Sequence, residues 1–187
     1  MLSPLLLLLA CGPDPNAPPP RPEGVLEVLE VETGGGDVVS ASDMVAGRSE
    51  GCTWGREIWR FDGDKAIVQN DVLCPADRAN ESFGCQVRVT GEASWNAERG
   101  VFVVPKRVGG MARFVGAKDS DIDPGPRTYC SVTLEAGEYP VARVRNGQWK
   151  WEMRTPAGMV LRLVVSDVKV DFGYAMAEVE KAKEAAQ

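Results

Sequence analysis

The sequence predicts a mainly β protein, built as a single antiparallel β-barrel, or as a curled sheet or sandwich, with an α-helix at the C-terminus. Two observations lead to this prediction. Most of the chain alternates apolar and polar residues with a period of two, as strands with one buried and one solvated face do. Turn residues interrupt this pattern at short intervals and no helix of normal length intervenes, which excludes parallel βαβ units.

Residues 85–95 form the clearest predicted strand, because apolar or small residues alternate with polar ones along the whole stretch. Residues 25–31 have an apolar spacing of three, which favours a short helix, but their valines and their length favour a strand. We expect a strand there. The remaining predicted strands are residues 57–61, 66–72, 101–104, 112–115, 128–134 and 159–165.

A hairpin is predicted near the end of the body. Residues 148–154 alternate with period two, which places Trp149 and Trp151 on one face and charged side chains on the other. The Asn-Gly pair at 146–147 is a strong signal for a type I′ turn after the strand-like stretch 139–144. We therefore expect Trp149 and Trp151 to be buried together, since a slip of one residue would expose every apolar side chain.

The C-terminal residues 174–187 predict a helix. They are rich in helix formers and carry Glu–Lys pairs three residues apart, Glu178 with Lys181 and Glu180 with Lys183. The apolar stripe of this helix is narrow, so we expect it to pack lightly on the barrel or to fray.

The N-terminal residues 1–10 contain five consecutive leucines and end in Ala10, just before Cys11. This stretch resembles the lipobox of bacterial lipoprotein signal peptides, and the resemblance implies cleavage before Cys11 and lipidation of Cys11. The apolar run is far shorter than the about 20 residues that a spanning helix needs. Residues 1–4 lack the positive charge of a signal peptide's start, so we expect the true start to lie upstream.

Residues 11–22 predict a tether, because their many prolines favour an extended spacer without a core of its own. Residues 23–187 then form one domain of about 160 residues. Two or more acyl chains hold a protein stably on a membrane, so we expect the membrane to be a partner through the lipid on Cys11. Gly12 is not the aspartate that the lipoprotein family associates with inner-membrane retention, which favours the periplasmic face of the outer membrane in the cell envelope.

Composition restricts the function classes. The formal net charge is −6 and no basic cluster stands out, so we expect no binding to nucleic acid. The chain has no histidine, the commonest general base and metal ligand. It also has no GxSxG, SxxK or P-loop motif, and we assign no catalytic residue. A hydrolase that uses two carboxylates stays the alternative, because the two carboxylates of such an enzyme need not be close in sequence.

Four cysteines remain beside Cys11, and an even number in an exported chain favours two disulfides. Four cysteines allow three pairings, and the sequence does not choose among them. In one of the three, Cys74 and Cys85 close the loop that they border, and Cys52 reaches Cys130. A zinc site is the rival, although the spacings are not those of a CxxC pair and no histidine assists. The four residues are Cys52, Cys74, Cys85 and Cys130.

The body from about Cys52 onward resembles the lipocalin-like, or calycin-type, small β-barrels, with short antiparallel strands, a tryptophan near the first strand and a terminal helix. That family opens on Gly-x-Trp, whereas here two residues separate Gly51 from Trp54. The resemblance implies a barrel that encloses a small apolar molecule, without catalytic residues. The five tryptophans line such a cavity or fill it, and the two outcomes stay open. They are Trp54, Trp59, Trp95, Trp149 and Trp151.

Three carboxylates at alternate positions, Asp119, Asp121 and Asp123, resemble the start of an EF-hand Ca²⁺ loop. The glycine of that motif is replaced by Pro124 and its glutamate by Cys130, which rejects an EF-hand. A solvated acidic loop is the favoured interpretation and an irregular Ca²⁺ loop the alternative. We expect no cofactor.

These observations together predict a non-enzymatic, lipid-anchored envelope protein, a binding or scaffold β-barrel for a small apolar ligand or a protein partner. The alternative is an envelope hydrolase that uses paired carboxylates.

Overall fold

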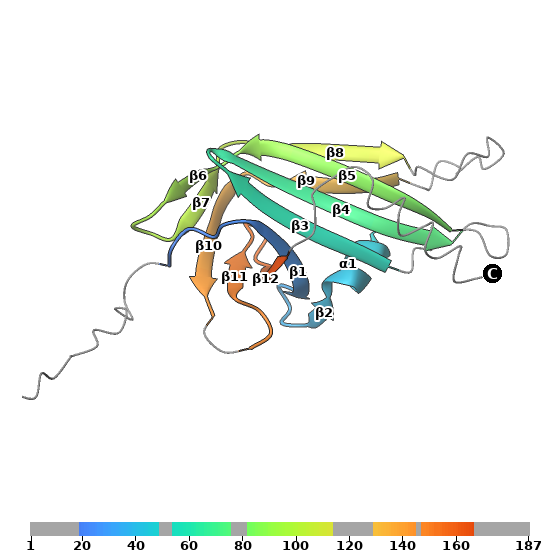
Figure 1. Ribbon diagram of the computed structural model, residues 1–187, viewed down its shortest axis with the longest axis horizontal. Coiled ribbons are helices and arrows are strands. Elements are labelled where there is room, and N and C mark those ends of the chain that lie inside the picture. The colour runs from blue at the N-terminus through green and yellow to red at the C-terminus, as the bar shows by residue number, and fades with distance from the viewer. Residues whose placement is uncertain (1–18, 49–53, 76–81, 114–128, 145–146, 167–187) are drawn as a thin grey trace, which may run out of the picture.

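The computed structural model describes residues 19–48, 54–75, 82–113, 129–144 and 147–166, with the backbone alone at 73–75, 82–85, 111–113 and 129–130. Ten strands form one antiparallel sheet that curls into a nearly closed barrel, in the order β5-β4-β3-β1-β12-β11-β10-β7-β6, and β2 pairs with β1 (Figure 1). Strands β8 and β9 form a separate ribbon that contacts β5.

The first half of the chain contains β1 (Val25–Glu32), β2 (Val38–Ser40), α1 (Ala41–Gly47), β3 (Trp54–Asp62), β4 (Lys65–Pro75) and β5 (Ser82–Glu92). The second half contains β6 (Ser94–Asn96), β7 (Val101–Val104), β8 (Val108–Arg113), β9 (Tyr129–Leu134), β10 (Gly137–Arg143), β11 (Trp151–Arg154) and β12 (Val160–Ser166). The predicted mainly β, antiparallel architecture is confirmed, and residues 25–31 are a strand. The predicted helix at 174–187 lies outside the described residues. No helix in the described ranges has the length and apolar character needed to cross a membrane.

The predicted single strand 85–95 is in fact two strands. β5 ends at Glu92, and β6 begins at Ser94 and pairs with β7 instead of β4. The change of partner occurs at Ala93, whose N–H donates to the carbonyl of Asp64 in the β3–β4 turn at 2.7 Å. Period-two alternation is the same in one long strand and in two short ones with a bend between them, so the sequence pattern does not reveal the break.

The hairpin of β10 and β11 is confirmed, but its register differs from the one that a two-residue Asn-Gly turn predicts. Arg143 pairs with Trp151, and the N–H of Val144 donates to the carbonyl of Lys150 at 2.9 Å. A two-residue turn at 146–147 would pair 145 with 148, one residue out of this register. Trp149 therefore precedes the strand, and the guanidinium of Arg162 lies 4.9 Å from its ring centroid. The prediction that Trp149 and Trp151 are buried together is wrong, because Trp149 is only half-buried.

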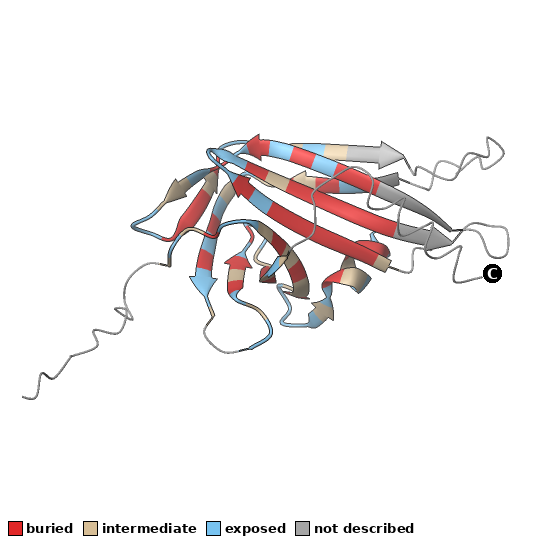
Figure 2. Cartoon of the chain, in the orientation of Figure 1, coloured by how far each residue is buried: buried red, intermediate tan, exposed pale blue. Residues whose placement is uncertain are grey.

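Aromatic rings fill the centre of the barrel. Phe61 stacks on Phe102 with ring centroids 3.6 Å apart and planes 4° apart. Trp59 packs against both Phe61 and Tyr139, with centroid distances of 6.0 and 5.6 Å. Trp95 packs against Phe102 with the ring centroids 4.6 Å apart. Figure 2 shows buried positions on most of the strands around this centre, including β3, β4, β5 and β10. The interior is therefore largely occupied by side chains.

The inner face of β3, β4 and β5, the face that carries Trp59, is covered by α1 and by the β8–β9 ribbon. A Cβ on Gly55 would lie 2.7 Å from the side chain of Val45 in α1, so glycine permits this close approach. A Cβ on Gly91 would likewise lie 2.6 Å from the side chain of Leu134 in β9. The hydroxyl of Ser40 accepts from the N–H of Asp43 at 3.0 Å and caps the helix.

Candidate functional site

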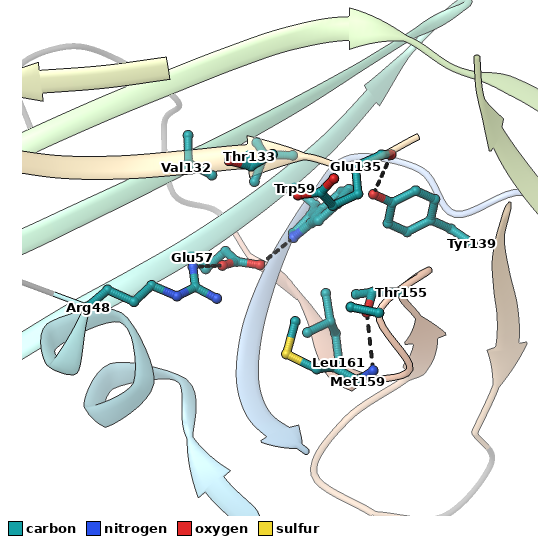
Figure 3. A pocket seen from close by; sticks show the side chains of 12 residues that line it. Arg48, Glu57, Trp59, Val132, Thr133, Glu135, Tyr139, Thr155, Met159 and Leu161 are labelled. Carbon is teal, nitrogen blue, oxygen red and sulfur yellow. Dashed lines mark hydrogen bonds and ion pairs between the residues drawn. The ribbon is translucent and has the colours of Figure 1, made fainter. Parts of the chain in front are cut away.

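A small pocket opens where the end of α1, the inner face of β3 and β4, and the β9–β10 and β11–β12 turns meet (Figure 3). Its volume is about 60 Å³. The lining residues are Arg48, Glu57, Trp59, Val68, Val132, Thr133, Glu135, Tyr139, Thr155, Ala157, Met159 and Leu161. Polar groups thus converge on a space whose other walls are apolar.

Glu57 is the buried carboxylate of this pocket, with its side chain 6 % exposed. Its Oε1 accepts a hydrogen bond from the indole Nε1 of Trp59 at 2.8 Å. Its Oε2 lies 3.2 Å from Nη1 of Arg48, which follows α1. Figure 3 shows both contacts reaching the carboxylate. Both carboxylate oxygens thus have a hydrogen-bond partner, which offsets the cost of burying the group.

Tyr139 forms the opposite side of the pocket. Its hydroxyl donates to the backbone carbonyl of Glu135 at 2.9 Å. Burial raises the pKa of Tyr139 to about 12, and the charges of Glu135 and Glu57 act in the same direction. The Glu135 carboxylate forms an exposed ion pair with Arg107 at 3.2 Å. Thr155 is also engaged, because its Oγ1 accepts from the N–H of Met159 at 3.2 Å.

The size of the pocket limits what it can bind. Pockets for drug-sized ligands measure about 300–1,000 Å³, whereas one water occupies about 30 Å³ of liquid. A volume of about 60 Å³ therefore suits a few waters or the end of one side chain. Within the described part of the chain, no three His, Cys, Asp or Glu residues are placed to hold a metal ion together.

The structure distributes the five tryptophans over different environments. Trp59 lines the pocket, and Trp151 is buried in the hydrophobic core. Trp95 is half-buried on Phe102, and Trp54 is half-buried at the start of β3. Trp149 lies against Arg162 outside the core. The described tryptophans therefore do not form one common ligand cavity.

The other predicted site residues fall largely outside the described part. Cys11, Cys52, Asp119, Asp121 and Asp123 lie outside the described residues. The backbone places Cys74 in β4, Cys85 in β5 and Cys130 in β9, but their side chains are not described. No disulfide is seen among the described side chains, and the pairing of the cysteines stays a prediction.

Sequence reasoning did not identify Arg48, Glu57 or Tyr139 as site residues. A signal was present for Glu57, because it shares the inward face of a period-two strand with Trp59 and Phe61. A charged residue at an inward position needs a partner. The partner, Arg48, directly follows α1, a helix that the sequence analysis did not predict.

The chain was compared with known protein families, curated proteins and solved structures. No family model, no curated protein and no solved structure matches this chain.

Proposed function

We propose that this protein is a non-enzymatic lipoprotein of the cell envelope, anchored through Cys11 to the periplasmic face of the outer membrane, with a β-barrel that serves as a scaffold for a protein partner. The observation that carries the scaffold role is the occupied interior. Stacked aromatic rings fill the barrel, and the pocket beside them measures only about 60 Å³. A small apolar ligand, the other role that the sequence predicts, needs a larger cavity.

Pro19 and Arg21, at the described end of the tether, contact the barrel, and these contacts support the proposed orientation of the barrel on the membrane. Nη2 of Arg21 donates to the carbonyl of Gly63 in the β3–β4 turn at 2.6 Å, and its guanidinium lies 5.8 Å from the ring centroid of Phe102. Pro19 packs so close to Gly100 that a Cβ there would lie 2.8 Å away. The chain thus leaves the barrel beside the β3–β4 turn, whereas α1 packs at the opposite end of β3. In this proposal, the α1 end faces away from the membrane and meets the partner.

One observation favours the alternative, an envelope hydrolase with paired carboxylates. Glu57 and Glu135 both line the pocket, with Trp59 drawn between them in Figure 3. Each carboxylate, however, is paired with an arginine, Arg48 or Arg107. Both ion pairs measure 3.2 Å, so each carboxylate is engaged by a guanidinium instead of being directed at a substrate.

Mass spectrometry tests the anchor. The protein is expressed in a Gram-negative host with its own or an extended start, and the N-terminal peptide of the membrane fraction is analysed. We expect a lipidated Cys11 at the mature N-terminus, and a Cys11→Ser control that stays unmodified and leaves the membrane fraction. A soluble periplasmic product with unmodified Cys11 would refute the anchor.

A fluorescent probe tests the scaffold role. The purified body is titrated with N-phenyl-1-naphthylamine, which becomes bright in apolar cavities. We expect no saturable binding, because stacked aromatic rings occupy the centre of the barrel and the pocket beside them measures only about 60 Å³. Saturable binding of one probe per chain would restore the apolar-ligand role instead. The hydrolase is tested separately, by loss of any measured hydrolysis in Glu57→Gln and Glu135→Gln.

A further inference from the structure

The strongest hydrogen-bond donors of the pocket at the end of α1 are directed at groups of the protein itself. The indole N–H of Trp59 donates to Oε1 of Glu57 at 2.8 Å, and Nη1 of Arg48 donates to Oε2 at 3.2 Å. The hydroxyl of Tyr139 donates to the backbone carbonyl of Glu135 at 2.9 Å. Each of these donors is used inside the protein, so a ligand of the pocket meets mainly acceptors.

The oxygens that line the pocket keep acceptor capacity. A carboxylate has about four acceptor positions, and the two described contacts of Glu57 occupy two of them. The contact with Arg48 therefore engages Glu57 without closing it to a further donor. The hydroxyl oxygen of Tyr139, whose hydrogen is donated, keeps its lone pairs. Oγ1 of Thr155 accepts one backbone N–H and has a second lone pair.

The lining of the pocket carries a negative charge. Two carboxylates, Glu57 and Glu135, stand against one guanidinium, Arg48, which gives a sum of −1. Arg107, the partner of Glu135, lies outside the lining, and the side chains of that pair are 68 % and 43 % exposed. Such an exposed pair contributes little. Burial raises the pKa of Tyr139 to about 12, and the charges of Glu135 and Glu57 act in the same direction. The pocket therefore favours a cation.

The remaining walls of the pocket suit an apolar stem. They are formed by the side chains of Val68, Val132, Ala157, Met159 and Leu161. A lysine side chain packs its methylenes on apolar surface of this kind while its charged end reaches polar groups. The volume of about 60 Å³ suits the end of one unbranched side chain. The ammonium group of lysine is compact, whereas the guanidinium of arginine is a broad planar group, so lysine fits better.

We propose that this pocket binds the ammonium end of a lysine side chain of the protein partner. The ammonium group donates to Glu57 and to the oxygens of Tyr139 and Thr155, and the lysine methylenes contact the apolar walls. The partner is that of the proposed scaffold role, on which this inference rests, and the pocket opens beside Arg48 at the α1 end that meets the partner (Figure 3). The pocket gives that surface one specific anchor, because a charge buried on binding needs a charged and hydrogen-bonded counterpart.

NMR of the full chain tests the proposal. The indole N–H of Trp59, assigned by its loss in Trp59→Phe, reports on the pocket, and that of Trp149, outside the core, is the internal control. The probe is Nα-acetyl-lysine N-methylamide, and the control compound is its norleucine analogue, which lacks the ammonium group. We expect the lysine probe to shift the Trp59 signal saturably with a Kd of about 1–10 mM, and the norleucine analogue to bind roughly tenfold more weakly or not at all. Equal binding of both compounds, or no saturable shift at Trp59, would overturn the proposal.

Glu57→Gln removes the negative charge and keeps an acceptor for Trp59. We expect it to weaken binding of the lysine probe by roughly tenfold or more, because the ammonium group loses its charged acceptor. The matched control is Glu138→Gln, since Glu138 also pairs with an arginine but lies outside the pocket lining, and its Kd should be unchanged. Retained affinity in Glu57→Gln, or an equal loss in both variants, would contradict the proposal. If Glu57→Gln does not fold, the comparison of lysine with norleucine on the native chain decides.

Butylammonium separates two sources of the ammonium group. A lysine of a partner carries a peptide backbone at the other end of its stem, so the lysine probe and butylammonium should both bind. Binding of butylammonium alone would replace the partner's lysine by a free alkylamine and overturn the proposal. Loss of all amine binding would reject the lysine pocket and leave the scaffold role, whereas saturable binding of N-phenyl-1-naphthylamine would reject the scaffold role itself.

Discussion

The indole N–H of Trp59 donates a hydrogen bond of 2.8 Å to Oε1 of Glu57, two residues earlier in the same strand. Both side chains point to the inner face of β3, since residues i and i+2 share a face. The second oxygen of Glu57 pairs with Arg48. This three-residue network joins the end of α1 to the barrel wall and orients the aromatic ring at the centre of the core.

Replacing Glu57 by Ala should lower the free energy of unfolding by about 3 kcal/mol, because the indole N–H of Trp59 and the guanidinium of Arg48 both lose their acceptor. Glu57→Gln should cost less, since an amide oxygen still accepts from Trp59. Lys106→Ala removes an exposed cation and should change stability by less than about 0.5 kcal/mol. Urea unfolding of the three variants gives these values. Equal stability of Glu57→Ala and the native chain would show that the network contributes nothing.

Trp151 and Trp149 should differ in their contribution to stability. Trp151 is 8 % exposed and pairs with Leu163 of β12, so Trp151→Ala should cost about 3–5 kcal/mol. Trp149 lies outside the core on Arg162, and Trp149→Ala should cost clearly less. Lys150→Ala, at an exposed position, should change little. Urea midpoints of the three variants test this order. If Trp149→Ala and Trp151→Ala cost the same, the environments described for the two rings are wrong.

Period-two alternation predicted the β class, the antiparallel architecture and most strands, because burial of one face imposes this pattern directly. It did not predict the break at Ala93 or the hairpin register, since both depend on the partner strand: the N–H of Ala93 bonds Asp64, and Val144 bonds Lys150. The sequence pattern did not predict the pocket either, because the pocket also depends on contacts between separate elements. Its ion pair joins α1 to β3, and no local pattern encodes the meeting of two elements.

The four body cysteines should form two disulfides. Cys74 in β4 and Cys85 in β5 border the loop between these two strands, so one of the three possible pairings joins them and leaves Cys52 for Cys130. Each bond should contribute about 2–4 kcal/mol. Thiol titration of the denatured, unreduced body should find no free thiol, and peptide mapping should find this pairing. Four reactive thiols would reject the bonds and restore the zinc site as the rival.

The stability of the protein should fall between about pH 10 and pH 12 because of Tyr139. An unfolded tyrosine has a pKa of about 10, and burial raises that of folded Tyr139 to about 12. Below pH 10 both states are protonated, and the native hydrogen bond to Glu135 is fully available. As the pH rises through this window, the unfolded state releases its proton first and is favoured, by about 1–2 kcal/mol at the upper end.

Tyr139→Phe separates this effect from the titration of other groups. At pH 8 the variant should be less stable by about 1 kcal/mol, because the carbonyl of Glu135 loses its donor. Between pH 10 and pH 12 its stability should fall less steeply than that of the native chain, so the two curves converge or cross. Urea unfolding at pH 8, 10, 11 and 12 gives both curves, and absorbance at alkaline pH reports tyrosine ionisation directly. Parallel curves across the whole range would mean that Tyr139 ionises equally easily in both states, and the burial described here would not explain its chemistry.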